Sequence, residues 1–227
     1  HIPTSGKVWV NGLDTSLPGN HAQIRSHVGM VFQNPEDQMI ASIVEEEVAF
    51  GLENMGVSRP EMIKRIRAVL KEYDLWEERS RPPHLLSSGQ IQRLALAGVL
   101  AMQPECIIFD ETTAMLDPVG RQTVMQSIRE MHRQGMTILY ITHAMEEAAQ
   151  ADRMIVLDKG RVAMDDTPAS VFSKPKILDS LGLELPEANH LARQLARLLP
   201  SIPSSVLSRE LLLSNLPAYD HAKYKPD

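Results

Sequence analysis

The chain has 227 residues, enough for one large domain or for a domain of about 150 residues with an appendage. Hydrophobic residues make up 43% of it and charged residues 23%, so neither disorder nor a fibrous repeat is indicated. The formal net charge of −6 argues against a nucleic-acid partner, because a phosphate-binding face normally leaves a basic balance.

The chain contains one cysteine and no candidate membrane-spanning segment. Cys106 lies in an apolar run, so we expect a small buried hydrophobic side chain and a reducing compartment. No stretch approaches the about 20 consecutive apolar residues that cross a bilayer. Any contact with a membrane is therefore expected to be peripheral.

Predicted strands and helices alternate along most of the chain. Strands are predicted at residues 7–10, 28–32, 106–109 and 137–141, and a hairpin at 153–157 and 161–164 that turns at Lys159 and Gly160. Helices are predicted at residues 61–73, after Ser88, and from Pro118 to Gly135. The helix after Ser88 is expected to place one face on the core, formed by Ile91, Leu94, Ala95, Gly98 and Val99.

This alternation predicts an α/β fold with a largely parallel sheet. The run 106–109 is expected to be a central strand buried on both faces, and 137–141 another buried strand. Ligands of such sheets lie outside the carboxyl ends of the strands. Asp110, Glu111 and His143 all fall there.

The pattern changes after residue 172, where polar-interrupted helices with several prolines begin. We therefore predict a main domain at residues 1–172 and a small helical appendage at 173–227. Its leucine stripe is read as a docking or core face, because the polar side is not rich in Lys and Arg as a membrane-lying helix would be.

Two adjacent acids end the run 106–109. Asp110 can hold Mg²⁺, which takes few protein oxygens, and Glu111 can polarise a water molecule, although an acidic loop after a strand would also explain the pair. Upstream, Ser87, Ser88, Gly89 and Gln90 precede a helix. Backbone N–H groups, serine hydroxyls and the helix dipole there make an anion site, although a simple N-cap would explain one serine.

Two further polar residues follow predicted strands. Gln33 can contact a metal-bound water or the γ-phosphate of a nucleotide, and His143 can donate to a phosphate oxygen. Taken singly, each is more often an ordinary solvated loop residue. It is the combination of these residues that indicates a nucleotide site.

Together these residues resemble the nucleotide-binding domain of ATP-binding-cassette (ABC) ATPases, which has a P-loop NTPase-like fold. The motifs occur in that family's order: Gln33 matches the Q-loop, 86–90 the signature motif, 107–110 the Walker B strand, Glu111 the catalytic glutamate, 114–117 the D-loop, and His143 the switch histidine. The resemblance implies ATP and Mg²⁺ as ligands, with Asp110 and Gln33 at the metal. It also implies a dimer in which Ser87, Ser88 and Gly89 serve the nucleotide held by the partner, with Gln90 and Asp117 as further nucleotide-binding residues and Asp117 communicating across the dimer.

A finer resemblance links residues 31–38, 48–54 and 114–118 to the energy-coupling-factor (ECF) ATPases, and Asn34 with Pro35 to the first of the two ATPases in that family. ECF ATPases drive the uptake of vitamins and transition-metal ions. The resemblance implies three partners: a second ABC ATPase subunit in a homo- or heterodimer, a transmembrane scaffold, and a substrate-binding membrane subunit. It also implies a peripheral location at the cytoplasmic face of the membrane.

Two departures from the family pattern stand out. Ser88 replaces a glycine of the usual signature, where a Cβ could crowd a phosphate. No Gly-x-x-x-x-Gly-Lys-Ser/Thr phosphate loop (Walker A) is present, and at Gly6 and Lys7 the following residue is Val8 instead of a hydroxyl. We expect a truncated N-terminus that lacks a strand, loop and helix of on the order of 30 residues, one supersecondary unit, and a chain that is inactive alone.

Two other functions remain open from the sequence. A non-hydrolysing cassette module would agree with the missing phosphate loop. A soluble ABC ATPase of DNA repair or translation is disfavoured, because the stretch between Gln33 and Leu86 is too short for a long coiled coil and only one cassette is present.

Overall fold

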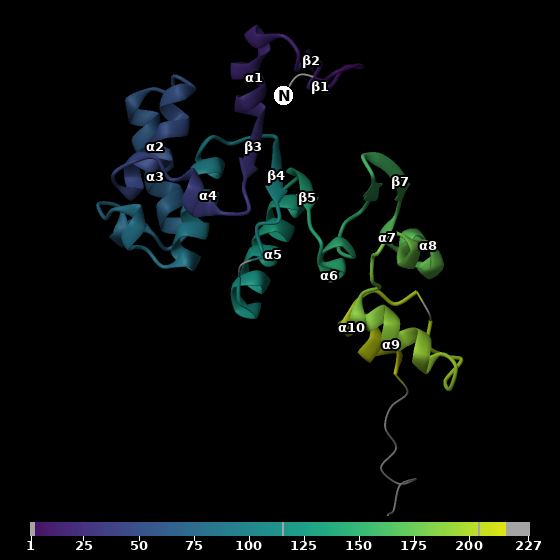
Figure 1. Cartoon of the computed structure of the whole chain (residues 1–227). Helices are drawn as coiled ribbons and strands as arrows, with labels where there is room; N and C mark the ends of the chain where they lie inside the picture. The colour runs from purple at the N-terminus through teal and green to yellow at the C-terminus, as the bar shows by residue number, and fades with distance from the viewer. Residues whose placement is uncertain (1–2, 115, 204, 217–227) are drawn as a thin grey trace, which may run out of the picture. The chain divides into compact units, whose positions relative to one another are not determined.

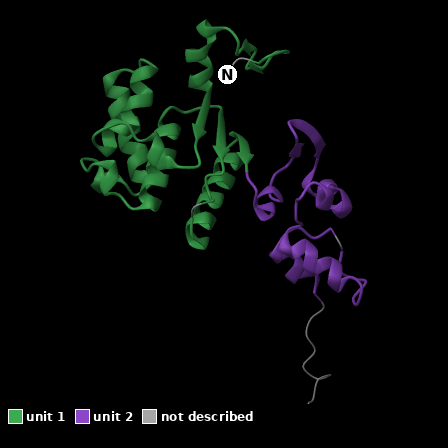
Figure 2. Ribbon diagram, viewed as in Figure 1, with its two compact units in different colours: residues 1–141 green, residues 142–227 purple. Residues whose placement is uncertain are grey.

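A computed structural model describes residues 3–114, 116–203 and 205–216. The chain divides into two compact units, residues 1–141 and residues 142–227 (Figure 2). The domain boundary expected near residue 172 is a different division and stays a prediction. Met115 of the predicted D-loop and the last residues of the predicted appendage, 217–227, lie outside the described residues.

The first unit contains the predicted strands and helices, with ends that differ by a few residues (Figure 1). In chain order it comprises β1 (Trp9–Val10), β2 (Leu13–Asp14), α1 (His21–His27), β3 (Val28–Val31), α2 (Val44–Asn54), α3 (Arg59–Glu72), α4 (Ser88–Ala101), β4 (Cys106–Asp110), α5 (Pro118–Arg133) and β5 (Thr137–Ile141). Short 3-10 turns lie at Pro18–Asn20, Pro35–Gln38, Trp76–Glu78 and Pro83–Leu85. The strand predicted at 7–10 is shorter than expected, and α1 and α2 are additional to the predicted helices.

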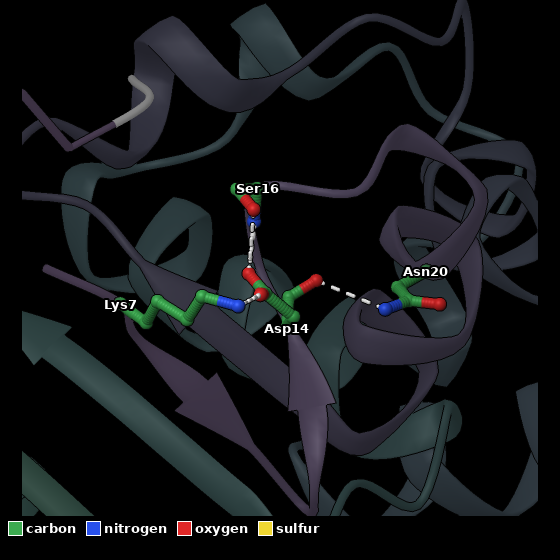
Figure 3. Close-up of polar contacts among 4 residues, drawn as sticks. All are labelled: Lys7, Asp14, Ser16 and Asn20. Carbon is green, nitrogen blue, oxygen red and sulfur yellow. Dashed lines mark hydrogen bonds and ion pairs between the residues drawn. The ribbon is translucent and has the colours of Figure 1, made fainter.

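Asp14 contacts several polar residues near the start of the chain. Asp14 is 5% exposed and accepts hydrogen bonds from the hydroxyl and the N–H of Ser16, at 2.7 and 2.9 Å (Figure 3). Lys7 Nζ lies 3.3 Å from its Oδ2, and Asn20 Nδ2 donates to its backbone carbonyl at 2.9 Å (Figure 3). The Ser16 hydroxyl, more than the Ser16 N–H or Lys7, holds the pKa of Asp14 below its ordinary value. Asp14 thus joins the β1–β2 hairpin to the segment that enters α1.

The sheet of the first unit is parallel, with the order β3-β4-β5. Parallel neighbours require crossover connections. The crossover from β3 to β4 contains α2, α3 and α4, and the crossover from β4 to β5 contains α5 (Figure 1). The predicted α/β fold with a parallel sheet is therefore confirmed.

Helix α4 lies between two apolar cores. Ile91, Leu94, Ala97 and Ala101 pack with buried residues of α2 and α3. Ala95, Leu96 and Val99 pack instead with β3, β4 and α5. The predicted face of Ile91, Leu94, Ala95, Gly98 and Val99 is buried or half-buried along its length. The sequence did not predict that this face and its flanks pack against two separate cores.

The sequence predicted that β4 and β5 are buried, and this is confirmed for one face of β4 only. Ile107 and Phe109 of β4 are fully buried beneath α4 and α5, whereas Cys106 and Ile108 on the opposite face are half-buried. In β5 the predicted burial is wrong, since Leu139 is 50% exposed. The apolar runs suggested helices on both faces, but the helical cover described in this unit lies on one face. Partial burial raises the pKa of the Cys106 thiol, as expected for an unreactive hydrophobic cysteine.

The second unit is built on the predicted hairpin. It comprises α6 (Met145–Ala148), β6 (Met154–Asp158), β7 (Arg161–Asp166), α7 (Pro168–Phe172), α8 (Pro175–Ser180), α9 (Glu187–Leu195) and α10 (Arg209–Asn215). Lys159 and Gly160 form the turn with φ of +48° and +74°, and β6 pairs antiparallel with β7. None of the helices that the structure describes in either unit is long and apolar enough to cross a membrane.

Candidate active site

The carboxyl end of β4 carries the two acids predicted to serve a nucleotide. Asp110 is the last residue of the strand, and Glu111 follows it with a left-handed backbone, φ +50°. The Glu111 N–H donates to the carbonyl of Ile141 at the end of β5 (2.9 Å), and its own carbonyl accepts from the N–H of Ala114 (3.0 Å). A left-handed conformation is uncommon in a residue with a side chain and often marks a functional turn. The chain therefore turns away from the sheet directly after Asp110.

The register of the sheet brings Gln33 to this turn. Val31 of β3 pairs with Phe109 of β4 in parallel, and Gln33 and Glu111 each lie two residues beyond that pair. Gln33 Nε2 donates to Glu111 Oε2 at 3.1 Å, across 78 residues of sequence. The structure thus joins two residues that the sequence suggested from separate motifs.

A hollow of about 520 Å³ opens beside this contact. It is lined by Phe32, Gln33, Asn34, Asp37, Gln38 and Asp110. Within the part of the chain that the structure describes, this lining includes two acids and no Lys or Arg, so a phosphate beside these acids would need a cation. The hollow is therefore suited to an anion that arrives together with a metal ion.

The oxygen atoms at this edge fit Mg²⁺. Mg²⁺ prefers oxygen ligands and usually takes one or two carboxylates from the protein, with water and phosphate filling the other positions. The Asp110 carboxylate meets that need, and because Gln33 Nε2 donates to Glu111, the Gln33 Oε1 is the atom left to face a cation. Among the described residues, no three His, Cys, Asp or Glu side chains gather into a metal site.

The start of α4 is a capping box. The Ser87 hydroxyl accepts from the Gln90 N–H at 3.3 Å, and the Gln90 side chain accepts from the Ser87 N–H at 2.9 Å. Ser88 and Gly89 are exposed in the first turn, where helix N–H groups have no partner within the helix. Ser87 and Gln90 therefore both cap the helix, whereas from the sequence an N-cap was expected to account for one serine only. The anion site predicted at Ser87, Ser88, Gly89 and Gln90 stays a prediction.

Asp117 also has a local structural role. It is the N-cap of α5, and its Oδ1 accepts from the Gly120 N–H at 2.7 Å. A Cβ built at Gly120 would lie 3.0 Å from that oxygen, so glycine gives the cap its room. The role of Asp117 toward a nucleotide stays a prediction.

His143 belongs to the second unit and lies two residues after the end of β5. Its side chain is exposed, as a residue that meets a ligand at a surface must be. The residues on either side of it are partly buried and hydrogen-bonded. Its predicted place near Glu111 stays a prediction.

Sequence reasoning missed part of the wall of the hollow. Asn34 Nδ2 donates to Asp37 Oδ2 at 3.2 Å, which links the two ends of the short turn that follows Gln33. The Gln38 side chain accepts from the N–H of Phe32 and donates to the carbonyl of Met30, both at 3.4 Å. The density of Asn, Asp and Gln within residues 33–38 was the signal available for these residues.

Comparison with known proteins identifies the family. A family model described as "ABC transporter" matches residues 1–114. The energy-coupling factor transporter ATP-binding protein EcfA1 of Clostridium novyi (strain NT) is 48% identical over 216 residues, which span 95% of this chain and 77% of that protein. The chain belongs to the ECF transporter ATP-binding subunits.

Solved structures of ABC ATPases agree with this ECF ATPase in fold. The structure of cbiO1 from Clostridium perfringens, described as part of the ABC transporter complex cbiONQ, is 34% identical with a TM-score of 0.68, and the match covers 84% of this chain and 77% of that one. A post-hydrolysis dimer of the ATP-binding cassette MJ0796 with ADP and Pi is 28% identical with a TM-score of 0.63, covering 73% and 75%. The ECF subunit therefore has the P-loop NTPase fold, and it is an ATPase of the ABC type.

Proposed function

We propose that this ECF subunit binds and hydrolyses ATP to drive the import of vitamins or transition-metal ions. The observation that carries the proposal is the hydrogen bond from Gln33 to Glu111 at the carboxyl end of β4, beside Asp110. It joins an amide, a candidate base and a candidate metal ligand at the sheet edge where α/β proteins bind ligands. The relatives are named as transporter ATP-binding proteins, which supports transport as the purpose of the hydrolysis.

Asp110 and Gln33 are the proposed holders of Mg²⁺. Asp110 contributes a carboxylate oxygen, and Gln33 contributes Oε1, since its Nε2 is engaged by Glu111. When bound, Mg²⁺ neutralises charge on the phosphates of ATP as the γ-phosphoryl group is transferred to water. Two protein ligands suffice for that purpose because phosphate and water fill the remaining positions.

Glu111 is the proposed general base. Its carboxylate takes a proton from the water whose oxygen attacks the γ-phosphorus, while the bond to the bridging oxygen of ADP breaks. The Gln33 amide holds this carboxylate by one oxygen, and the left-handed turn holds its backbone. His143 is proposed to donate a hydrogen bond to the γ-phosphate.

The start of α4 is proposed to bind the nucleotide of a second ABC ATPase subunit, in a homo- or heterodimer. Ser87, Ser88 and Gly89 offer hydroxyl and N–H donors at the positive end of a helix of 14 residues, and Gln90 holds Ser87 by the capping box. Asp117 is proposed to act across the same dimer. A transmembrane scaffold and a substrate-binding membrane subunit are the further partners proposed, with the ATPase bound peripherally at the cytoplasmic face.

Two alternative functions are less well supported. A non-hydrolysing module has no need of a base oriented by Gln33. A soluble ABC ATPase of DNA repair or translation disagrees with relatives that are named as transporter proteins over 95% of this chain. The cargo is proposed from the family alone, and uptake of labelled vitamins and of transition-metal ions by the assembled transporter tests it; transport of neither class would contradict that part.

The base assignment is tested with Glu111→Gln, made in the natural gene product and assembled with its partner subunits. General-base catalysis is worth about 10²- to 10⁴-fold, so ATP hydrolysis should fall by at least about 100-fold while ATP still binds. Glu130→Gln is the matched control, because Glu130 is an exposed acid on α5 that pairs with Arg133 at 3.4 Å. Full turnover by Glu111→Gln would remove Glu111 as the base.

A further inference from the structure

Glu147 is a buried acid to which the mechanism above gives no role. It lies in α6 and is 4% exposed, although its neighbour Glu146 is exposed. Burying a carboxylate is costly unless hydrogen bonds compensate it. Glu147 Oε2 accepts a hydrogen bond of 2.6 Å from the Thr142 hydroxyl. The buried acid is therefore hydrogen-bonded to Thr142, in the segment before α6.

The same hydroxyl binds the backbone on the other side of His143. Thr142 Oγ1 accepts from the Ala144 N–H at 3.0 Å, so the Ala144 N–H, the Thr142 hydroxyl and the Glu147 carboxylate form one chain of hydrogen bonds. The Ala144 carbonyl accepts in turn from the Glu147 N–H at 3.1 Å. Hydrogen bonds in such chains strengthen one another. The backbone is thus held immediately before and immediately after His143.

We infer that Glu147, acting through the hydroxyl of Thr142, is a positioning residue for His143, an inference that rests on the γ-phosphate role proposed for His143. Its carboxylate orients the hydroxyl, and the hydroxyl fixes the turn from which the imidazole projects. His143 itself is exposed, and the hydrogen bonds of Thr142 and Ala144 act on the backbone on either side of it. Misplacing a catalytic group by about 1 Å can cost about 100-fold in rate.

The rival explanation is that Glu147 only stabilises the fold around α6. The two explanations differ in what they predict for catalysis when His143 is absent. A positioning residue has nothing left to position, so its removal then costs nothing further. A residue that stabilises the fold costs the same with or without the imidazole.

The experiment uses the natural gene product assembled with its partner subunits. Glu147→Ala and Thr142→Val remove the two ends of the 2.6 Å bond, whereas Glu147→Gln and Thr142→Ser keep an acceptor and a hydroxyl. Glu146→Ala is the matched control, because it removes the same charge one residue away. We measure kcat and KM for ATP hydrolysis, and thermal unfolding, for each variant and for the variants combined with His143→Ala.

Glu147→Ala and Thr142→Val should each lower kcat by about 10- to 100-fold while KM for ATP stays within about twofold. Glu147→Gln, Thr142→Ser and Glu146→Ala should stay within about threefold of the natural protein. In the His143→Ala background, Glu147→Ala should lower kcat by less than about twofold. The Glu147→Ala and Thr142→Val double variant should be no slower than either single variant.

Three results would overturn the inference. The first is an unchanged kcat in both Glu147→Ala and Thr142→Val. The second is an equal loss of kcat with and without His143, which would make the role structural. The third is a natural kcat in His143→Ala, which would also remove the γ-phosphate role of His143. Because His143→Ala is measured by itself, failure of the proposed function is distinguished from failure of the Glu147 inference alone.

Discussion

Substitutions at Ser87 can separate its structural role from its proposed role in nucleotide binding. The Ser87 hydroxyl caps α4 by accepting from the Gln90 N–H at 3.3 Å. Ser87→Ala removes that bond and leaves the N–H exposed to water. Ser87→Asp keeps a capping oxygen, since Asp is as good an N-cap as Ser, and adds a charge that favours the helix start. Ser87→Ala should therefore lose stability that Ser87→Asp keeps, whereas Ser87→Asp should lose ATP hydrolysis.

The magnitudes follow from the geometry. An N-cap is worth about 0.5–2 kcal/mol, and the long bond at an exposed site places Ser87→Ala near the lower half, at about 1 kcal/mol. In a protein of this size, that lowers Tm by about 2–4 °C. In Ser87→Asp, a carboxylate about 4 Å from a phosphate oxygen meets a repulsion of about 4 kcal/mol at an effective dielectric constant of about 20. If solvent and salt screen this repulsion to about a quarter, about 1 kcal/mol remains, which lowers nucleotide affinity by about fivefold.

The assays are urea unfolding and steady-state ATP hydrolysis, both on the assembled natural gene product. Ser87→Asp should match the natural protein in stability and lose most of its hydrolysis. Ser87→Ala should lose about 1 kcal/mol of stability. Natural turnover in Ser87→Asp would refute the proposal that α4 binds a phosphate, and unchanged stability in Ser87→Ala would refute the capping argument.

Two further predictions concern stability. Phe109→Ala removes a fully buried ring of β4 and should cost about 3–5 kcal/mol in urea unfolding, whereas Leu139→Ala in the neighbouring strand, 50% exposed, should cost less than about 1 kcal/mol; equal costs would contradict the one-sided burial of the sheet. Asp14→Asn should show a pH-dependent loss. The pKa of Asp14 in the folded chain lies below its ordinary value of 3.8, so its stabilisation is present above 3.8 and is lost as pH falls through the folded pKa. The difference in Tm between Asp14→Asn and the natural protein should be largest near neutral pH and should disappear in strong acid. A difference that is constant with pH would contradict the lowered pKa of Asp14.

Local features of the fold followed well from the sequence. The helix predicted at residues 61–73 is α3, and the turn predicted at Lys159 and Gly160 joins β6 and β7. Pro118 was expected at a helix start, and α5 begins there. These features depend on backbone preferences and on contacts between residues a few positions apart, which a sequence displays directly.

Burial of the sheet could not be predicted in the same way. The apolar runs 106–109 and 137–141 look alike, yet Phe109 is fully buried and Leu139 is half exposed. Which face of a strand meets a helix depends on where α4 and α5 pack, and α4 contacts β3, a strand distant from it in sequence. The same limit explains why the sequence did not show that α4 packs against two cores.

For the candidate site, residue types and motif order in the sequence by themselves determined the family, and with it the expected roles of Asp110, Glu111 and Gln33. Only the tertiary structure decided which of these side chains meet: the parallel register of β3 and β4 places the Gln33 amide on the Glu111 carboxylate. It also decided that Glu147, one of two adjacent acids, is the buried one and binds Thr142 beside His143. Motifs record chemistry that short stretches of chain can carry, whereas pairing and burial arise from residues brought together across long loops, which no short stretch contains.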